Sequence, residues 1–260
     1  MSSKRLSVLA MLCAFIAAGA WAGSASAQTA EVKDKPPMYT YVSNWTYPRA
    51  RWGDVEKNNA ATDKVMEKAL ASGVLVGYGS DAVLVHESEG PTHDDWFSSM
   101  SVAGLLNTLD EVYKAGGASS ALLMSATKHS DSMWVSRFYN WRSGSWKGAY
   151  TRTAVYKLKP GAPNDAVEML SKNVFVPMLE KLLADGALVE YEIDVQAIHT
   201  ESPDLFAIDI IAPTAEGLDK WSAAVRDAGR KNPLIGAAIG SLTESSGHHD
   251  YLSRTTAAYK

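Results

Sequence analysis

The sequence predicts an α+β fold made of two similar halves, and the main observation behind this prediction is a stretch that the chain carries twice. Residues 68–86 return as residues 181–199, an offset of 113 positions, without a gap. Nine of the nineteen positions are identical: Lys68/Lys181, Leu70/Leu183, Ala71/Ala184, Gly73/Gly186, Leu75/Leu188, Val76/Val189, Tyr78/Tyr191, Asp81/Asp194 and His86/His199. Self-similarity at a fixed offset indicates an internal duplication.

The second observation is that strands and helices are expected in the same order in both halves. In the first half, residues of high β propensity predict strands over 38–45, 74–86, 94–101 and 133–141. Apolar residues three and four positions apart predict helices over 54–72 and 102–114. Gly73 follows the first of these helices, where a left-handed cap is expected.

The second half repeats this order. Strands are predicted over 150–158, 187–199 and 205–211, and helices over 164–185 and 214–230. Pro177 is expected to kink or divide the first of these helices. The tail at 247–254 echoes 128–137, and residues 142–148, with two glycines and two serines, are the predicted linker.

Each half therefore reads strand–helix–strand–strand–helix–strand, which is the ferredoxin-like unit. A four-stranded antiparallel sheet with helices on one face leaves its other face uncovered. Two such units in one chain can bury these faces against each other as an α/β barrel. The first repeat is assigned to residues 38–147 and the second to residues 148–260.

The first 27 residues are interpreted as a signal peptide. Lys4 and Arg5 precede an almost wholly apolar run over residues 6–22, and Ala-Ser-Ala at 25–27 supplies the small-residue cleavage pattern. The mature chain would then begin with an unstructured leader over residues 28–37, and the protein would be periplasmic or secreted.

Composition argues against several functional classes. Removal of residues 1–27 takes away two cations and the only cysteine, Cys13, so the formal charge changes from −4 to −6 and no thiolate ligand or disulfide remains. A mildly acidic chain without a basic run is a poor candidate for binding nucleic acid or, after signal cleavage, a membrane. The chain also lacks a phosphate-binding Gly-rich loop, a paired-histidine zinc helix and a hydrolase nucleophile elbow.

The order of the elements resembles that of the dimeric α/β-barrel superfamily, here as a tandem duplication covering about residues 38–260. The resemblance rests on topology and repetition. That superfamily includes small cofactor-free monooxygenases, haem-linked enzymes and stress-responsive proteins, so the resemblance implies a barrel fold and leaves the activity open.

The candidate catalytic residues form a His-x-Asp pattern before the last strand of each half: His129 and Asp131, and His248 and Asp250. Alternate residues of an extended chain point the same way, so each histidine can share a face with its aspartate. Such a pair can orient an imidazole as a general base or supply two metal ligands. In the structural alternative, the aspartate accepts a backbone N–H and the histidine packs where the strand begins.

The second strand of each half supplies four candidate ligand-binding residues: Tyr78, His86, Tyr191 and His199. Tyr191 and His199 belong to an apolar face that we expect under the helices. The opposite face carries Glu190, Glu192, Asp194 and Gln196. If that face points between the two sheets, three acids line a cavity and have shifted pKa values. Otherwise it is a solvated face. The first repeat has Gly77 and Gly79 there, which predicts more room on that side.

Arg49 and Trp52 are further candidate ligand-binding residues. They lie in a turn at 45–52 that combines aromatic and arginine side chains. Stacked rings and guanidinium groups suit a planar or anionic ligand at the mouth of a barrel. The alternative is a turn held together by its own aromatic contacts.

The leading functional prediction is binding or transformation of a small apolar or aromatic molecule in the barrel cavity. As an enzyme the protein would be cofactor-independent, with a His–Asp pair taking a proton from the substrate and the barrel excluding water. The first alternative is a non-catalytic envelope or stress-response protein that binds a protein partner. The second is a haem- or metal-dependent oxidoreductase. Tandem duplication leaves both a monomer and a homodimer open.

Overall fold

The computed structural model describes residues 32–259, apart from residue 59, residues 86–88 and residues 201–202. The predicted signal peptide, residues 28–31 of the predicted leader and His86 lie outside the described residues. Within these ranges, no helix is long and apolar enough to cross a membrane.

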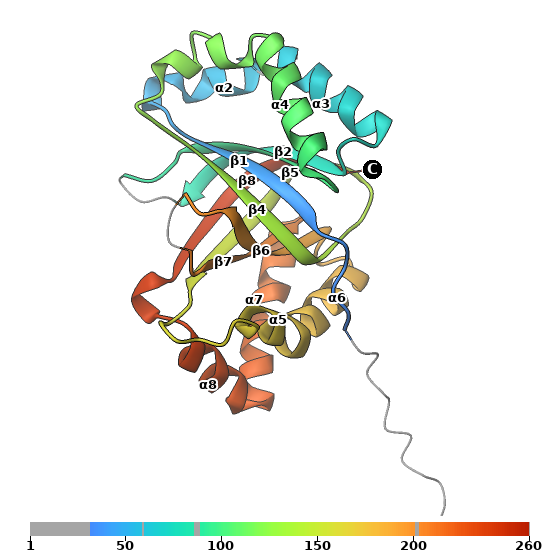
Figure 1. The fold of residues 1–260 in the computed structure, drawn as a ribbon, viewed down its shortest axis with the longest axis vertical. Helices are drawn as coiled ribbons and strands as arrows, with labels where there is room; N and C mark the ends of the chain where they lie inside the picture. The colour runs from blue at the N-terminus through green and yellow to red at the C-terminus, as the bar shows by residue number, and fades with distance from the viewer. Residues whose placement is uncertain (1–31, 59, 86–88, 201–202, 260) are drawn as a thin grey trace, which may run out of the picture. The chain divides into compact units, whose positions relative to one another are not determined.

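In the described part of the chain, antiparallel strands form a closed barrel in the order β1-β3-β2-β8-β5-β7-β6-β4 (Figure 1). The strands are β1 (Met38–Thr46), β2 (Gly77–Val85), β3 (His93–Ser99), β4 (Lys128–Trp141), β5 (Gly144–Lys157), β6 (Glu190–Ile198), β7 (Leu205–Ala212) and β8 (His249–Tyr259). Closure leaves no strand edge unpaired.

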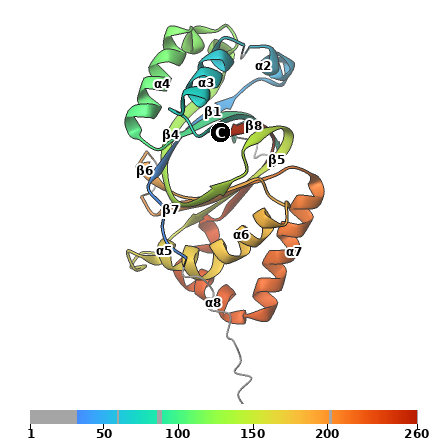
Figure 2. The ribbon, with the colours of Figure 1, turned by 90° about the vertical axis from the view of Figure 1, so that its right-hand side faces the viewer.

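The ring consists of two runs of neighbouring strands, β4-β1-β3-β2 and β8-β5-β7-β6, joined where β2 pairs with β8 and β4 with β6. Helices cover the outside of each run (Figures 1 and 2). The first run is covered by α2 (Trp52–Asn58), α3 (Ala60–Ser72) and α4 (Val102–Lys114). The second is covered by α5 (Ala166–Leu170), α6 (Val176–Ala184), α7 (Ala215–Lys231) and α8 (Pro233–Leu242). The predicted α+β barrel is therefore confirmed.

The hydrophobic core lies between the barrel and its helices. In the second run, Tyr191 and Ile193 of β6 pack with Leu179 and Leu183 of α6 and Trp221 of α7. In the first run, a smaller cluster joins Phe97 of β3 and Met133 of β4 to Leu105 of α4. Burial of these outward faces fixes the strand register, because a slip of one residue would turn the apolar face into the barrel.

Two helices show the local signals that position them. The Ser101 side chain caps α4 by accepting from Gly104 N at 3.1 Å, and Thr214 caps α7 at Gly217 N. Pro177 divides the predicted 164–185 helix, as expected: a π-turn over Ser171–Phe175 precedes α6, and Pro177 lies in its first turn, where its missing N–H costs least.

The predicted linker at 142–148 is wrong, because β5 already begins at Gly144. Gly144 pairs with Tyr259, and the pairing of β5 with β8 continues through a register shift between Lys147 and Ala149. Gly148 has φ +80° at this bulge, a conformation that favours glycine. The helix α8, which follows Asn232 as its N-cap, was not predicted.

One end of the barrel is filled by an aromatic and apolar cluster that we call the plug. Its buried members are packed by three partly buried tryptophans: Ala149, Val189, Ile211, Ala257 and Tyr259, with Trp96, Trp141 and Trp146. A Cβ on Gly77 would lie 2.6 Å from the Tyr259 ring, and one on Gly79 would lie 2.6 Å from the Trp96 ring. The space expected beside these glycines is therefore occupied by aromatic rings from neighbouring strands.

Candidate functional site

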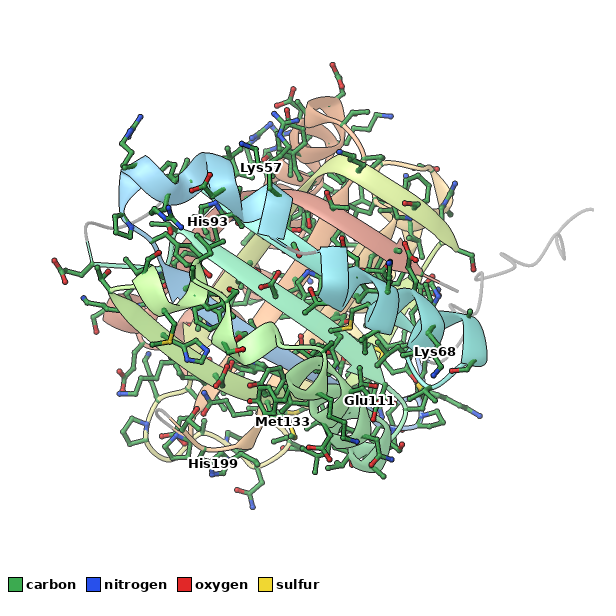
Figure 3. All side chains as sticks on the ribbon, turned by 90° about the horizontal axis from the view of Figure 1, so that it is seen from above. Lys57, Lys68, His93, Glu111, Met133 and His199 are labelled. Carbon is green, nitrogen blue, oxygen red and sulfur yellow. The ribbon has the colours of Figure 1, made fainter. Side chains whose placement is uncertain are left out.

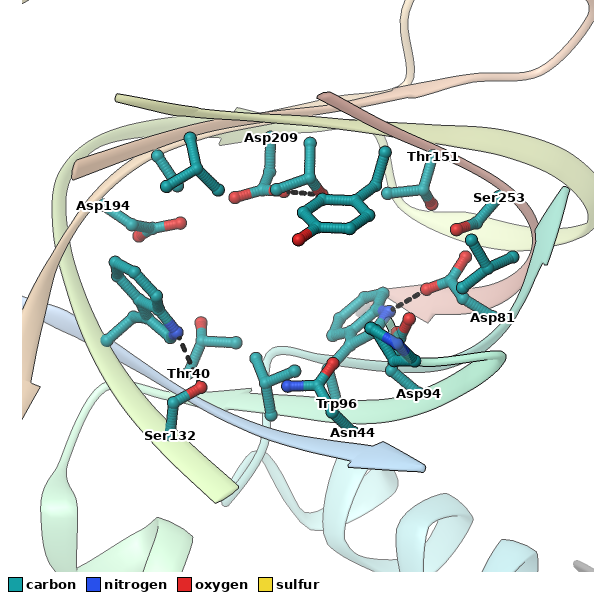
Figure 4. Close-up of a pocket in the computed structure, with 18 of the residues that line it drawn as sticks. Thr40, Asn44, Asp81, Asp94, Trp96, Ser132, Thr151, Asp194, Asp209 and Ser253 are labelled. Carbon is teal, nitrogen blue, oxygen red and sulfur yellow. Dashed lines mark hydrogen bonds between the residues drawn. The ribbon is translucent and has the colours of Figure 1, made fainter. Parts of the chain in front are cut away.

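The barrel encloses a cavity of about 880 Å³ (Figure 4). This volume is in the range of small-molecule sites. Trp96 and Tyr259 belong both to the cavity wall and to the plug, which closes one end. At the other end the wall is formed by strand ends and loops, which we call the mouth: Thr46, Glu89, Pro91, Lys128, Lys157 and Gly247.

Six acidic side chains of the wall, which we call the interior carboxyls, come from four strands: Asp81 (β2), Asp94 (β3), Glu190, Glu192 and Asp194 (β6), and Asp209 (β7). Side chains of a strand alternate between its faces. Because Tyr191 and Ile193 occupy the core face of β6, its acidic residues point into the barrel. The structure thus has the arrangement in which the polar face of this strand lines a cavity.

Apart from Glu190, the interior carboxyls form two groups. The first group is the pair Asp81 and Asp94, which lie directly opposite each other on β2 and β3. Trp96 Nε1 donates to Asp81 Oδ2 at 2.9 Å (Figure 4). Burial raises the pKa of both carboxyls, and the charge of Asp81 raises the pKa of Asp94 further. Two facing acids in a desolvated site therefore favour a state that keeps at least one proton.

Glu192, Asp194 and Asp209 form the second group, on β6 and β7. The Thr40 hydroxyl donates to Glu192 Oε2 at 3.1 Å, and the Thr153 hydroxyl donates to Asp209. Burial raises the pKa of Glu192 to about 8 and that of Asp209 to about 6. Burial, followed by the charges of Glu192 and Asp209, raises the pKa of Asp194 well above its usual range.

Two buried polar atoms of the wall, Glu190 Oε1 and Tyr259 Oη, have no hydrogen-bond partner among the described residues. Glu190 is only 3% exposed and Tyr259 only 6%. Burial raises the pKa of both, with nearby acids adding to the effect. An unpartnered buried polar group costs about 1–3 kcal/mol, so water or a ligand is required to satisfy these atoms.

The two lysines of the wall lie at the mouth, where each has its own carboxylate. Lys128 pairs with Glu89, and Lys157 Nζ lies 3.2 Å from Glu244. Within the described ranges, no interior carboxyl forms an ion pair with a basic side chain. The interior therefore carries acidic groups that no neighbouring cation compensates.

The structure brings His129 and Asp131 together: His129 Nε2 lies 3.0 Å from Asp131 Oδ1. Ser43 Oγ donates to the same carboxylate oxygen at 2.8 Å and lies 3.0 Å from His129 Nε2. The imidazole stacks on Trp45 with 3.8 Å between ring centroids. His129 borders the mouth, whereas Asp131 is not part of the cavity wall.

His248 and Asp250 also meet, with 3.4 Å between His248 Nε2 and Asp250 Oδ2. The imidazole stacks on Tyr156, and its Nδ1 lies 2.9 Å from the carbonyl oxygen of Val155. Arg152 donates to Asp250 Oδ1 at 2.8 Å. Neither His248 nor Asp250 contributes to the cavity wall. Both His–Asp pairs share a face as expected, and their catalytic role stays a prediction.

Arg49 and Trp52 contact each other, with the guanidinium carbon 5.2 Å from the centre of the Trp52 ring. Trp52 Nε1 donates to the carbonyl oxygen of Tyr47 at 3.0 Å, and its ring meets His93 edge-on. Neither Arg49 nor Trp52 borders the cavity. These contacts match the alternative of a turn held by its own aromatic side chains.

Of the predicted ligand-binding residues of the second strands, the three that the structure describes, Tyr78, Tyr191 and His199, lie outside the cavity. Tyr191 is buried under α6 and donates to Glu180 Oε1 at 2.6 Å. Tyr78 packs into the core of the first run. His199 follows β6 and is exposed at the periphery of the view in Figure 3.

Sequence reasoning missed much of the cavity wall, including Asp94, Trp96, Trp134, Asp209 and Tyr259. Asp209 had a usable signal, because it is the single charged residue in the apolar strand Leu205–Ala212. The aromatic residues had none, since their position depends on which strands become neighbours when the barrel closes. Among the described residues, no three His, Asp or Glu side chains are arranged to hold a metal ion.

The hydroxyls that contact the second group provide a direct test of its electrostatics. Replacement of Thr40 by Val is expected to raise the pKa of Glu192 above about 8, because the lost hydrogen bond stabilises the charged form. Thr153→Val is expected to raise the pKa of Asp209 instead. Carbon NMR titration of the side-chain carboxyls checks both. A shift at the same carboxyl in both variants would contradict the assignment.

The fold has counterparts among solved structures. They include a proposed monooxygenase from Lactobacillus acidophilus (TM-score 0.57, 12% identity, 86% of this chain and 97% of that chain). A proposed monooxygenase from Fusobacterium nucleatum also matches, with a TM-score of 0.56 and 7% identity over 87% of this chain and 95% of that chain. An anthrone oxidase-like protein matches with a TM-score of 0.52 and 8% identity over 85% of this chain and 92% of that chain. No protein-family model and no curated protein matches the chain. At these identities the likeness shows the fold alone, an α+β barrel of the ferredoxin-like kind, here with an acidic cavity.

Proposed function

We propose that this protein binds a small polar molecule inside the barrel, admitted through the mouth. The observation that carries this function is the set of unpartnered polar atoms on the wall of the 880 Å³ cavity. A folded chain that buries such groups without partners loses about 1–3 kcal/mol for each of them, and a ligand that hydrogen-bonds to them recovers part of that loss. Two proposed monooxygenases and an anthrone oxidase-like protein share the fold, which is compatible with chemistry on a small molecule.

The lining favours a ligand with hydrogen-bonding groups over the wholly apolar one that the sequence suggested. Trp96, Trp134 and Tyr251 offer ring surfaces for stacking, so an aromatic or carbon-chain part can be accommodated. The carboxyls that surround these rings would lose hydration against an apolar molecule without gaining a partner.

Native mass spectrometry of the protein taken from its own host tests this function. The expected result is a mass excess over the bare chain that disappears on denaturation. Ser253→Phe, which places a ring in the cavity, should abolish the excess, whereas Ser245→Phe on an exposed turn should retain it. An excess retained equally by both variants would place the ligand elsewhere.

A second candidate function is cofactor-independent catalysis in the same cavity, and the pKa of Glu192 is the observation that favours it. A carboxyl whose pKa lies near 8 exchanges protons readily at neutral pH, as a general acid or base must. The variants His129→Ala and His248→Ala test whether the His–Asp pairs take part in catalysis, as the sequence predicts, or only stabilise the fold. Lower melting temperatures with unchanged ligand affinity would assign these pairs a structural role.

We further propose that the two runs of strands descend from one ancestral half and that the protein is exported. The identities between residues 68–86 and 181–199 support duplication, as does the corresponding strand order within each run. The pattern of residues 1–27 supports cleavage before Gln28. N-terminal sequencing of the protein from the envelope fraction should begin at that residue, and an intact N-terminus would refute export by this route.

A haem does not fit the barrel interior. Its two propionates are anionic, and inside the barrel they would lie among acidic side chains without a cation to pair with, because both lysines of the wall are paired with carboxylates at the mouth. Binding of a protein partner to the outer surface remains an alternative proposal. Capture of a partner by the Ser253→Phe variant, whose cavity is filled, would separate that function from binding inside the barrel.

A further inference from the structure

We propose that the molecule bound inside the barrel is an organic dication, a linear diamine or polyamine, with one ammonium group at each of two opposite acidic walls. This inference rests on the function proposed above and specifies the chemical class of the ligand.

The first argument is charge. The wall of the cavity carries the six interior carboxyls, and its two lysines, Lys128 and Lys157, are neutralised at the mouth by Glu89 and Glu244. A cation that enters the cavity replaces lost hydration with charge-assisted hydrogen bonds to carboxylates, which are stronger than neutral ones. An anion would find no unpaired lysine in the wall and would be repelled by every interior carboxyl that is ionised.

The second argument is the arrangement of the acids in the ring. In the strand order β1-β3-β2-β8-β5-β7-β6-β4, two strands separate β2 from β7, and two strands separate β3 from β6. The Asp81–Asp94 pair and the acids of β6 and β7 are therefore on opposite sides of the barrel. Figure 4 shows Asp81 and Asp194 facing each other across the cavity. Two separated acidic walls fit two separated positive charges.

The third argument is the presence of groups that point to a ligand independently of the acids. The Tyr259 hydroxyl is buried, lines the cavity and has no partner among the described residues. It can accept a hydrogen bond from an ammonium group. Trp96 and Trp134 present ring surfaces in the same wall, and such rings attract alkylammonium groups through their quadrupole.

The spacing of the acids favours an extended organic cation over one metal ion. Among the described side chains, no three potential ligands converge on a point where a metal would be held. The volume of about 880 Å³ far exceeds that of a single ion but suits a chain with an amine at each end.

Calorimetric titration of the full mature chain with matched probes tests the proposal. Cadaverine carries two charges, pentylamine has the same chain length with one charge, and glutarate is a dianion of the same length. Cadaverine is expected to bind about tenfold more tightly than pentylamine, because a second charge-assisted contact is formed. Glutarate should not bind. Titration in two buffers of different ionisation enthalpy should show protons released, since the cation ionises carboxyls that hold protons.

Variants then assign the two charges to the two walls. Asp81→Asn and Asp194→Asn should each reduce cadaverine affinity to the level of pentylamine, whereas Asp219→Asn on the exposed surface of α7 should not. Circular dichroism verifies that each variant is folded. Equal affinities for the two amines, or no binding of cadaverine, putrescine or spermidine, would overturn the proposal. In that event a mass excess lost in Ser253→Phe would still support binding of another polar molecule in the barrel.

Discussion

From about pH 4 to pH 8 the protein is expected to lose stability as the pH rises. The interior carboxyls have folded-state pKa values above their ordinary values of 3.8 and 4.5, about 6 for Asp209 and about 8 for Glu192. In this window the folded state binds more protons than the unfolded state, so the free energy of unfolding decreases with pH. Each such proton contributes about 1.4 kcal/mol per pH unit. Urea unfolding at several pH values measures the slope, and a stability that increases from pH 4 to pH 8 would contradict the electrostatics of the cavity.

The variant Asp194→Asn tests whether the interior carboxyls, and not other titratable groups of the protein, cause this loss of stability with rising pH. The amide keeps the shape of the side chain and cannot ionise, so it should be more stable than the wild type at pH 8 by about 1–3 kcal/mol, with little difference at pH 4. Asp219→Asn, on the exposed face of α7, is the matched control. If this control flattens the pH profile as much as Asp194→Asn does, the cavity is not responsible.

The substitution Gly217→Ala is expected to destabilise the protein by about 3 kcal/mol or more, because the first turn of α7 packs directly on backbone. An added Cβ would overlap the carbonyl oxygen of Ala187 and would lie 3.0 Å from the Cβ of Ala212. Neither neighbour is the end of a flexible side chain, so α7 itself must move away from the sheet. The measurement is the free energy of unfolding in urea.

Gly229→Ala in the same helix provides the control. Nothing lies within 4 Å of the position that its Cβ would take. Alanine restricts the unfolded chain and favours the helix, so this variant should gain about 0.5–1 kcal/mol. Equal losses in both variants would mean that contact with Ala187 does not determine the effect at Gly217.

Much of the fold could be predicted because its signals are local. The periodicity of residues 102–114 gave the bounds of α4, and Pro177 marked the division before α6. The start of β5 could not be predicted in the same way. Residues 144–148 have turn-like composition, and they are extended because β8 pairs with them from a segment about a hundred positions away.

The site was predictable only where strand alternation determines it. Alternation placed Glu190, Glu192 and Asp194 on one face of a strand but left open whether that face lines a cavity or meets solvent. In the structure the apolar face lies under the helices, and the acids face inward. Asp94, Trp96 and Tyr259 reach the same space from other strands. Their position follows from the pairing of β2 with β3 and β8, which depends on barrel closure and on no local pattern. The His–Asp spacing identified real contacts, but it carried no information about which side of the barrel they occupy.

The plug determines the order in which molecules could enter and leave the barrel. Because Trp96, Trp141 and Trp146 pack across one end, a ligand bound as proposed would enter and leave the barrel by the same route, past His129 and Lys128. Two molecules inside such a barrel cannot pass each other, so the first to arrive is the last to leave. A reaction with two substrates would then follow a compulsory order, and excess of the second would trap the first.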